Sequence, residues 1–391
     1  MKLRSVALLV FSHTATDINQ GAIPVLLPFF IAQHQISYAA AAGFVFAINV
    51  ASTIAQPIFG HFADRRSRPW LIPMAMLCAG IGVSLIGVVP NFWVGVLVVG
   101  LSGVGVAAFH PEGARLIHYL AGQRKATAMS FFAVGGQLGY AIGPLIATAA
   151  MLLWGLRGSV SLIVPAGIVA GLMIYKLPRF SGIGQPRGSG PSRHTSGAAN
   201  DAWIPFAVLS IVLLSRSVIF YGLNTFLPLF WINVLHQSKA AAGTALTLLM
   251  TASIGGNLLG GRMADRFGYR IISIIGFVFL MGLLPLFVRI ESAPQALLLL
   301  IPIGVSLSLS TSPLVVLGQG YLPSRVGLAS GVTLGLAFSF GGIMTPVLGE
   351  IADHHGLQAA ISVVAYIPIV CTALTLALPA LRTPSPESAT S

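Results

Sequence analysis

Charged residues are scarce in this sequence: Asp, Glu, Lys and Arg make up 8% of its 391 residues, against about a quarter in soluble domains. Hydrophobic residues make up 55%. This balance excludes a soluble globular domain. The apolar runs are each about 20 residues or longer, enough for a helix to cross a hydrocarbon layer of about 30 Å, and the alternating pattern of a membrane β-barrel is absent. We therefore expect an all-α, multi-pass protein embedded in the lipid bilayer.

Cysteine and the common catalytic motifs are also scarce or missing. The two cysteines, Cys78 and Cys371, lie in apolar runs without the spacing of a disulfide or a metal site. The sequence has no Walker phosphate loop, no H-E-x-x-H motif and no paired aspartates or Ser/His arrangement at catalytic spacing. We therefore expect no enzyme, no metal and no cofactor. Lys and Arg (21) outnumber Asp and Glu (9), but no basic patch is interleaved with aromatics, so we expect no nucleic-acid partner.

Polar, glycine and proline breaks divide the apolar sequence into twelve predicted spans. They cover residues 5–33, 38–63, 70–90, 92–120, 124–152, 158–178, 203–235, 239–264, 270–290, 294–322, 325–352 and 356–381. The stretch between the sixth and seventh spans is rich in Gly, Ser and Pro and cannot bury enough apolar surface to order itself. We therefore predict an N-terminal six-helix half (1–178), a cytoplasmic linker (179–202), a C-terminal six-helix half (203–381) and a polar tail (382–391).

Lysine and arginine are distributed unevenly between the two sides of the predicted bundle. Most of them fall at the termini and in the even-numbered loops, whereas the opposite loops hold only Arg157, Lys239 and Arg289. Basic loops stay on the cytoplasmic side of a membrane. Both termini are therefore predicted to be cytoplasmic. The apolar stretch at the start of the chain is short and is followed by polar residues. We therefore predict an uncleaved first helix and not a signal peptide.

A polar sequence motif occurs twice at equivalent positions of the two halves. GHFADRRSRPW begins at Gly60 and GRMADRFGYRI begins at Gly261, so the motif recurs after 201 positions. Both copies fall at the end of the second predicted span of a half, in the loop to the third. LLPFF (26–30) returns as FLPLF (226–230) with nearly the same offset. The two halves are therefore predicted to be copies of one six-helix unit.

The repeated motif resembles the signature of the major facilitator superfamily, which is G-x-x-x-D-R-x-G-R-R in the loop after the second helix. The resemblance covers the full length, and the matching residues are Gly60, Asp64, Arg65 and Arg68 in the first copy and Gly261, Asp265, Arg266, Gly268 and Arg270 in the second. Ser67 and Tyr269 depart from the signature. The resemblance implies a cytoplasmic gate in which Asp and Arg side chains hold the two halves together. The alternative is that these arginines only set the topology.

Two further stretches resemble the fosmidomycin-resistance branch of bacterial drug-efflux transporters within that superfamily. They are AAFHPEGAR (107–115) in the fourth span and SHTATDINQGAIPVLLPFF (12–30) in the first. This resemblance implies drug efflux across the bacterial inner membrane. We expect the chain to be a monomer.

Acidic residues inside the spans are the first functional candidates, because a charge within the membrane costs a few kcal/mol. Only Asp17 and Glu112 fall well inside spans. His13 lies one turn before Asp17 on the same helical face, where an imidazole and a carboxylate can share a proton. We predict that Asp17, His13 and Glu112 serve proton coupling. The alternatives are a static ion pair at His13 and Asp17, and a role for Glu112 as the counter-ion of Arg115.

Two arginines inside the spans indicate the charge of the substrate. Arg115 and Arg216 belong to different halves, and a guanidinium forks onto carboxylate or phosphonate oxygens, so both are predicted to bind an anionic substrate at a central site. The alternative for Arg216 is snorkelling to the headgroups. Further substrate contacts are predicted from polar residues in the spans, which could instead only pack helices: His110, Gln137, Tyr140, Tyr221 and Asn224.

These features predict a proton-coupled secondary transporter that works by alternating access of its two halves. The expected mode is antiport, with export of a small drug or organic anion in exchange for protons. A proton symporter that imports an organic anion has the same residue inventory and is the first alternative. A non-transporting membrane receptor or an intramembrane enzyme is a more remote one, since it would leave the duplicated motif unexplained.

Overall fold

The structure is a computed structural model that describes residues 3–65, 68–121, 125–180, 183, 201–325, 328–329 and 331–380. These residues are mostly helical, and no β-strand occurs among them. Eight of their helical stretches are long and apolar enough to span a membrane. The predicted all-α membrane fold is therefore confirmed. Most of the predicted linker 179–202 and the whole predicted tail 382–391 lie outside the described residues.

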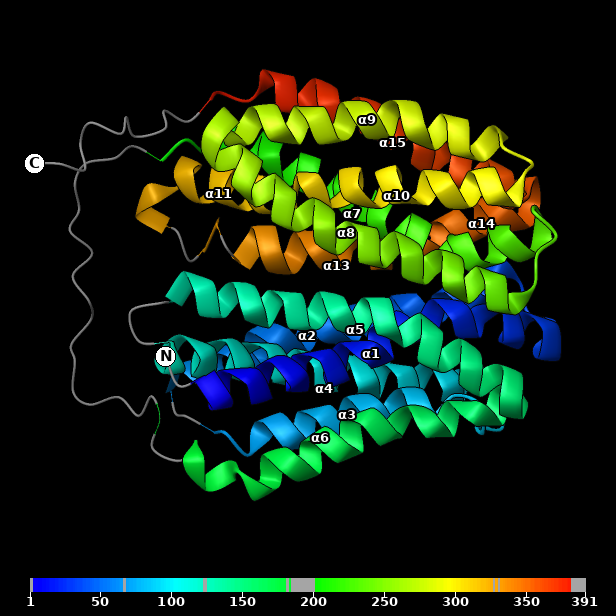
Figure 1. The fold of residues 1–391 in the computed structure, drawn as a ribbon, viewed down its shortest axis with the longest axis horizontal. Coiled ribbons are helices and arrows are strands. Elements are labelled where there is room, and N and C mark those ends of the chain that lie inside the picture. Colours follow the sequence, from blue (N-terminus) through cyan, green and yellow to red (C-terminus); the bar gives the residue numbers. More distant parts are fainter. Residues whose placement is uncertain are drawn as a thin grey trace, which may run out of the picture.

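The helices form two bundles that follow each other in the chain (Figure 1). The first bundle holds α1 (Leu3–His34), α2 (Tyr38–Arg65), α3 (Leu71–Leu85), α4 (Phe92–Leu120), α5 (Lys125–Trp154) and α6 (Ile163–Tyr175). The second holds α7 (Trp203–Asn233), α8 (Lys239–Phe267), α9 (Tyr269–Arg289), α10 (Ala293–Leu309), α11 (Thr311–Tyr321), α13 (Ala337–Ile343), α14 (Thr345–His355) and α15 (Leu357–Ala377).

Equivalent helices pair in the two bundles. α1 packs on α5, α2 on α4 and α3 on α6; in the second bundle α7 packs on α13, α8 on α10 and α9 on α15. The same three pairings therefore occur in each half. This equivalence matches the repeat of about half the chain length that is visible in the sequence.

Two of the predicted spans are interrupted in the structure. The span 294–322 is divided into α10 and α11 at Ser310, and the span 325–352 into the π-helix η4 (Gly331–Leu336), α13 and α14. Pro313 and Pro346 follow the two breaks within three residues and lack the N–H that would continue the preceding helix. Backbone carbonyls at such a break become available to side chains.

The two halves meet at one end of the bundle. α1 begins and α15 ends at the left in Figure 1; we call this the terminal end, and the opposite end the distal end. At the distal end, Gly349 of α14 lies so close to α2 that a β-carbon there would come within 2.5 Å of Ala39 Cα. Gly243 of α8 lies closer still to α5, since a β-carbon there would come within 2.1 Å of Thr148 Oγ1. Small residues thus let the halves approach closely at the distal end.

Asp353 of α14 caps the first turn of α2 across the boundary between the halves. Its carboxylate accepts hydrogen bonds from the backbone N–H groups of Tyr38 (2.7 Å) and Ala39 (2.9 Å), while Ser37 Oγ accepts one from Ala40 (3.1 Å). The first N–H groups of a helix have no intrahelical acceptor, and the helix N-terminus carries a partial positive charge. A carboxylate of the C-terminal half therefore holds α2 of the N-terminal half at the distal end.

Replacing Asp353 by alanine is expected to open the distal end more often. An exposed carboxylate at a helix N-terminus contributes about 0.5–1 kcal/mol, so the distally open population should rise about two- to fivefold. The measurement is labelling of a cysteine introduced at Ser52, which lines the cavity described below, by a membrane-impermeant maleimide from the distal side, with Cys78 and Cys371 replaced by serine.

Glu350→Gln is the matched control, because Glu350 lies on the same helix and pairs with His354 (2.8 Å) within its own half. Its labelling rate is expected to equal that of the parent protein. Equal labelling of the Asp353→Ala and Glu350→Gln variants would show that the cap does not hold the halves together.

Candidate functional site

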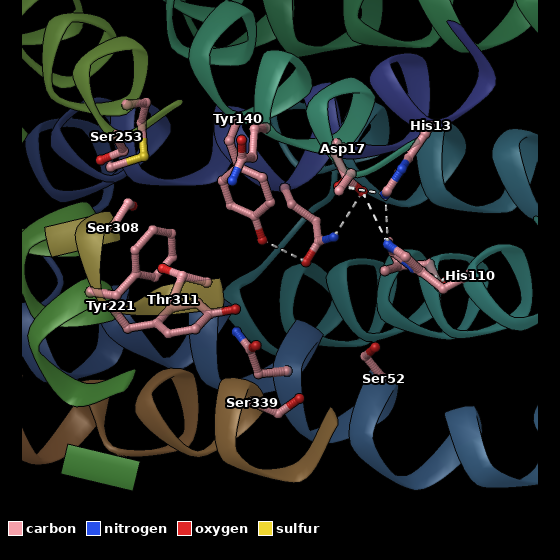
Figure 2. Close-up of a pocket in the computed structure, with 18 of the residues that line it drawn as sticks. His13, Asp17, Ser52, His110, Tyr140, Tyr221, Ser253, Ser308, Thr311 and Ser339 are labelled. Atoms are coloured by element: carbon pink, nitrogen blue, oxygen red, sulfur yellow. Dashed lines mark hydrogen bonds and ion pairs between the residues drawn. The ribbon is translucent and has the colours of Figure 1, made fainter. Parts of the chain in front are cut away.

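A cavity of about 330 Å³ lies between the two halves. The N-terminal half contributes His13 and Asp17 from α1 and His110 from α4, and the C-terminal half contributes Tyr221 from α7 and Thr311 from α11 (Figure 2). Each half therefore supplies a polar wall, as a substrate site between two rocking halves requires.

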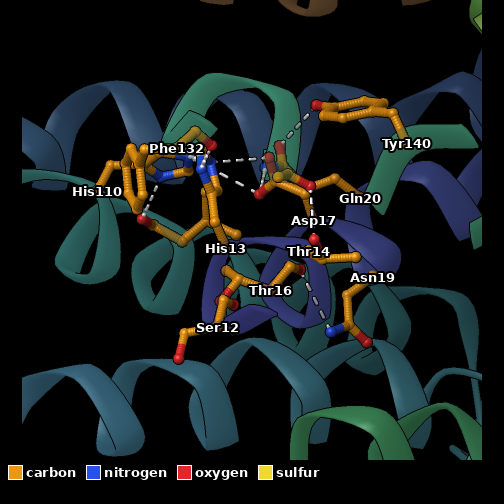
Figure 3. Close-up of polar contacts among 12 residues, drawn as sticks. Ser12, His13, Thr14, Thr16, Asp17, Asn19, Gln20, His110, Phe132 and Tyr140 are labelled. Atoms are coloured by element: carbon orange, nitrogen blue, oxygen red, sulfur yellow. Dashed lines mark hydrogen bonds and ion pairs between the residues drawn. The ribbon is translucent and has the colours of Figure 1, made fainter. Parts of the chain in front are cut away.

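His13, Asp17 and His110 form a cluster on the N-terminal wall (Figure 3). His13 Nε2 lies 3.2 Å from Asp17 Oδ2 and 3.1 Å from His110 Nε2, and His110 Nε2 lies 3.7 Å from Asp17 Oδ1. The contact between His13 and Asp17 has the i,i+4 spacing expected from the sequence. One ring nitrogen or carboxylate oxygen from each of the three lies within 4.8 Å of the others. These atoms are close enough to share a proton or to surround a cation.

Gln20 and Tyr140 extend this cluster along α1. Gln20 Nε2 donates to Asp17 Oδ1 (3.2 Å), and the Tyr140 hydroxyl donates to Gln20 Oε1 (3.1 Å). Gln20 is a contact that the sequence reasoning missed, although it lies three residues after Asp17 on the same helical face. Gln137 also lines the cavity, and its Oε1 is buried without a hydrogen-bond partner among the described residues. This oxygen can accept a hydrogen bond from a substrate.

Glycines of α5 explain why α1 can lie so close to that helix. A β-carbon at Gly136 would come within 2.7 Å of His13 Nε2 and 2.8 Å of Asp17 Oδ2, and one at Gly139 within 2.6 Å of the Thr14 carbonyl oxygen. A real side chain at either position would have to displace its neighbours. The glycines of the stretch VGGQLGYAIGP (134–144) therefore set the spacing of α1 and α5 at the cavity.

Arg216 is a buried cation on the C-terminal wall. It is 6% exposed, and its Nε donates to Ser310 Oγ (3.2 Å) and its Nη2 to the Leu307 carbonyl (3.1 Å) and to Thr311 Oγ1. These acceptors lie at the break between α10 and α11, where helix C-terminal carbonyls lack intrahelical partners and attract a cation. No carboxylate of the described residues forms an ion pair with Arg216. Arg216 thus lines the cavity in a buried position, whereas snorkelling to the headgroups would require its guanidinium to reach the membrane surface.

Glu112 and Arg115 pair with each other outside the cavity lining. Arg115 Nε donates to Glu112 Oε2 (3.0 Å) and Nη2 to Glu112 Oε1 (2.9 Å). Glu112 is fully buried and also accepts a hydrogen bond from the backbone N–H of Arg68 (3.0 Å). The pairing given above as the alternative role of Glu112 is therefore present, and its predicted role in proton coupling stays a prediction. The structure does not bring Arg115 together with Arg216 at one central site.

The other predicted substrate contacts divide between two spaces. His110, Gln137, Tyr140 and Tyr221 line the central cavity. Asn224 instead lines a small adjoining space, next to Tyr140 and Tyr221. Most of the predicted contacts thus share one cavity with Arg216.

The duplicated gate motif makes its described contacts within its own half. Asp265 accepts a hydrogen bond from the Tyr269 hydroxyl (3.1 Å), and Arg270 donates to the carbonyls of Thr375 and Leu376 at the end of α15. The Arg68 and Arg266 guanidinium groups lie over the rings of Phe62 and Phe267, and Gly60 and Gly261 have open space beside them. The side chains of Asp64 and Arg65 lie outside the described residues. None of the described motif side chains bonds to the opposite half, so the gate role stays a prediction.

Comparisons with known proteins agree with this architecture. The model of the Major Facilitator Superfamily matches residues 9–346. The chain is 27% identical over 374 residues to the Fosmidomycin resistance protein of Escherichia coli (strain K12), which covers 94% of this chain and 91% of that protein. It is 28% identical over 367 residues to the uncharacterized MFS-type transporter YfnC of Bacillus subtilis (strain 168), which covers 92% and 88%.

Solved transporter structures share the fold at low sequence identity. A crystal structure of a bacterial homolog of the human lysosomal transporter Spinster matches with a TM-score of 0.81 at 15% identity over 96% of both chains. The nucleoside transporter NupG matches with a TM-score of 0.78 at 14% identity, over 95% of this chain and 98% of that one. Two helical halves around a central cavity are the architecture of a secondary transporter. The chain belongs to the Major Facilitator Superfamily; it is a multi-pass membrane transporter and not an enzyme.

Proposed function

We propose that this transporter exports a small organic anion by alternating access, coupled to protons. The observation that carries the proposal is Arg216, a buried guanidinium that lines the cavity without a carboxylate partner among the described residues. A charge buried without a counter-ion is costly. The guanidinium Nε and Nη2 already donate to Ser310, Leu307 and Thr311, so a carboxylate or phosphonate of a substrate would accept charge-assisted hydrogen bonds from the N–H groups of Nη1. Because Gln137 Oε1 is a free acceptor in the same cavity, the substrate should also carry a hydrogen-bond donor.

The arrangement of the halves supports the proposal that substrate enters from the cytoplasm. The halves contact each other at the distal end through Asp353 and Gly349, while the described motif side chains at the terminal end bond within their own halves. The distribution of basic residues predicts that the terminal end is cytoplasmic. In that orientation the distal contacts separate the cavity from the outside, and substrate enters from the cytoplasm.

The proposal of export, and not import, rests on the similarity of the chain to a drug-resistance protein. The Fosmidomycin resistance protein matches along nearly the whole chain, and removal of a drug from the cytoplasm is a direct route to resistance. Fosmidomycin or another small phosphonate or carboxylate is therefore the first substrate class to test.

A proton symporter that imports an organic anion is the second candidate. An anion at Arg216 and a proton at the His13, Asp17 and His110 cluster occupy one cavity, and their opposite charges favour simultaneous binding. Simultaneous binding suits symport, whereas antiport requires that each ligand exclude the other. The direction of proton flow decides between the two modes.

The test is transport by the purified protein in proteoliposomes with an internal pH dye. Fosmidomycin, other small organic anions and lipophilic cations are added under an imposed pH gradient. We expect anions to move with protons in the opposite direction and cations to cause no proton movement. Protons that move with the anion would establish symport instead. Transport of cations alone would overturn the role of Arg216 in binding an anion. Anion flux that does not depend on the pH gradient would overturn proton coupling.

A further inference from the structure

We propose that the coupled proton resides on the His13 and His110 pair, one proton at a time, and that Asp17 stays ionised as its counter-ion. Asp17 is then a positioning residue for the imidazolium and does not itself carry the proton. This inference rests on the proposed proton coupling, but the place of the proton follows from the hydrogen-bond geometry of the two rings.

One nitrogen of each ring is fixed by a backbone carbonyl. His13 Nδ1 lies 2.7 Å from the Phe132 carbonyl oxygen, and His110 Nδ1 lies 2.8 Å from the Val106 carbonyl oxygen (Figure 3). A carbonyl oxygen can only accept a hydrogen bond, so both Nδ1 atoms must carry hydrogen and donate. In the neutral form of each ring, Nε2 is then the atom without hydrogen.

The two Nε2 atoms face each other at 3.1 Å, with carboxylate oxygens of Asp17 at 3.2 Å and 3.7 Å. If both rings are neutral, this space holds only acceptors, and their lone pairs repel. One proton on either Nε2 creates an N–H donor to the other ring and a charge-assisted contact with the carboxylate. A second proton would place two imidazolium ions next to each other, which their mutual repulsion opposes. The pair therefore takes up one proton.

Few other titratable or charged groups face the pair from the packed helices. α5 brings Gly136 and the ring of Phe132 against His13, and neither can titrate. On α4, the Glu112 carboxylate is already bonded to Arg115. α2 contributes only neutral side chains to the cavity wall. The remaining groups among the described residues are Asp17 on α1, Tyr140 on α5 through Gln20, and Arg216 and Tyr221 across the cavity.

Asp17 is thus the one carboxylate in contact with the pair among the described residues. Its oxygens accept from Gln20 as well as from a protonated ring, and hydrogen bonds to the ionised form of a carboxylate favour that form. The proton is accordingly held by nitrogen, while Asp17 stabilises the charge that the nitrogen acquires.

The direct test is ¹⁵N NMR of histidine-labelled protein in nanodiscs, with the two rings assigned through His13→Gln and His110→Gln. We expect both Nδ1 atoms to carry hydrogen and one proton to be shared between the Nε2 atoms, with the shared signal lost in either variant. An Nδ1 atom without hydrogen would overturn the proposal. A change of the Nε2 signals on adding EDTA would show a bound metal in place of the proton and would also overturn it.

Infrared difference spectra between the protonated and deprotonated protein give a second readout. We expect imidazole bands that disappear in His110→Gln, and no protonated-carboxyl band that disappears in Asp17→Asn. Such a carboxyl band would place the proton on Asp17 and refute the inference. Both spectroscopic results are independent of transport, so they stand even if the transport assay shows no proton coupling.

Transport by the Asp17→Asn variant distinguishes two possible roles of Asp17, as the counter-ion of the imidazolium or as the carrier of the proton. Loss of an opposite charge about 3 Å away disfavours the imidazolium, so the pH profile of coupled transport should shift to lower pH. Asp201→Asn is the matched control, because Asp201 pairs with Arg325 outside the cavity, and its profile should not shift. If Asp17→Asn is folded but shows no coupled transport at any pH, Asp17 itself carries the proton.

Discussion

Replacing Arg216 by methionine is expected to weaken the binding of an anionic substrate by at least about 100-fold. Two charge-assisted hydrogen bonds from the Nη1–H groups contribute about 3 kcal/mol or more, and each 1.4 kcal/mol is a factor of ten in affinity. Methionine keeps the apolar length of the side chain in its buried position but cannot bond a carboxylate or phosphonate. Arg216→Lys keeps the charge without the planar guanidinium. Its affinity for the anion is therefore expected to lie between those of the parent protein and Arg216→Met.

The measurement for Arg216 is the stabilisation of each purified variant by the substrate. Binding to the folded state raises the midpoint of thermal unfolding by an amount that grows with the logarithm of the ligand concentration divided by Kd. Without ligand, two changes in the stability of Arg216→Met oppose each other: the desolvation cost of a buried charge is removed, while the Leu307 carbonyl and the hydroxyls of Ser310 and Thr311 lose their donor.

Arg289→Met is the matched control for this loss of charge, because Arg289 is exposed at the end of α9 and lies outside the central cavity. It should bind the anion as the parent protein does. If Arg216→Met binds the anion as tightly as Arg289→Met, the substrate is not held by Arg216.

The sequence predicts the parts of the structure that depend on local spacing and composition. Hydrophobic runs predict membrane helices because the bilayer imposes one length and one backbone geometry on them. The spacing of His13 and Asp17 predicts their contact, and that of Glu112 and Arg115 predicts theirs, because residues three or four apart share a helix face. The break at Ser310 is harder to foresee, since serine and proline are tolerated within membrane helices.

Contacts between distant helices do not follow from such patterns. The two arginines inside the spans look equivalent in the sequence, yet Arg115 has a carboxylate partner on its own helix and Arg216 bonds to the broken backbone between α10 and α11. The approach of His110 to His13 depends on how α4 and α1 pack, which hydropathy does not encode. A signal for part of this packing is nevertheless present, namely the closely spaced glycines of α5, which only the structure connects to the cluster.

Replacing Gly136 by alanine is expected to reduce transport at least about tenfold while the protein remains folded. The new β-carbon would lie within 2.8 Å of both His13 Nε2 and Asp17 Oδ2, so α1 or the two side chains must move. Overpacking of this kind costs about 1–3 kcal/mol, and a displacement of about 1 Å at a functional group can cost 100-fold in rate. The measurements are flux in proteoliposomes and the midpoint of thermal unfolding.

Gly100→Ala is the matched control for Gly136→Ala, because a β-carbon at Gly100 of α4 meets no atom within 4 Å. It should leave transport unchanged and stabilise the helix by up to about 1 kcal/mol. Equal flux through both variants would show that the close approach of α1 and α5 is not needed. Since Gly136→Ala keeps every polar group of the cluster, a loss confined to it would show that the spacing of the two helices, and not only the presence of His13 and Asp17, makes the site function.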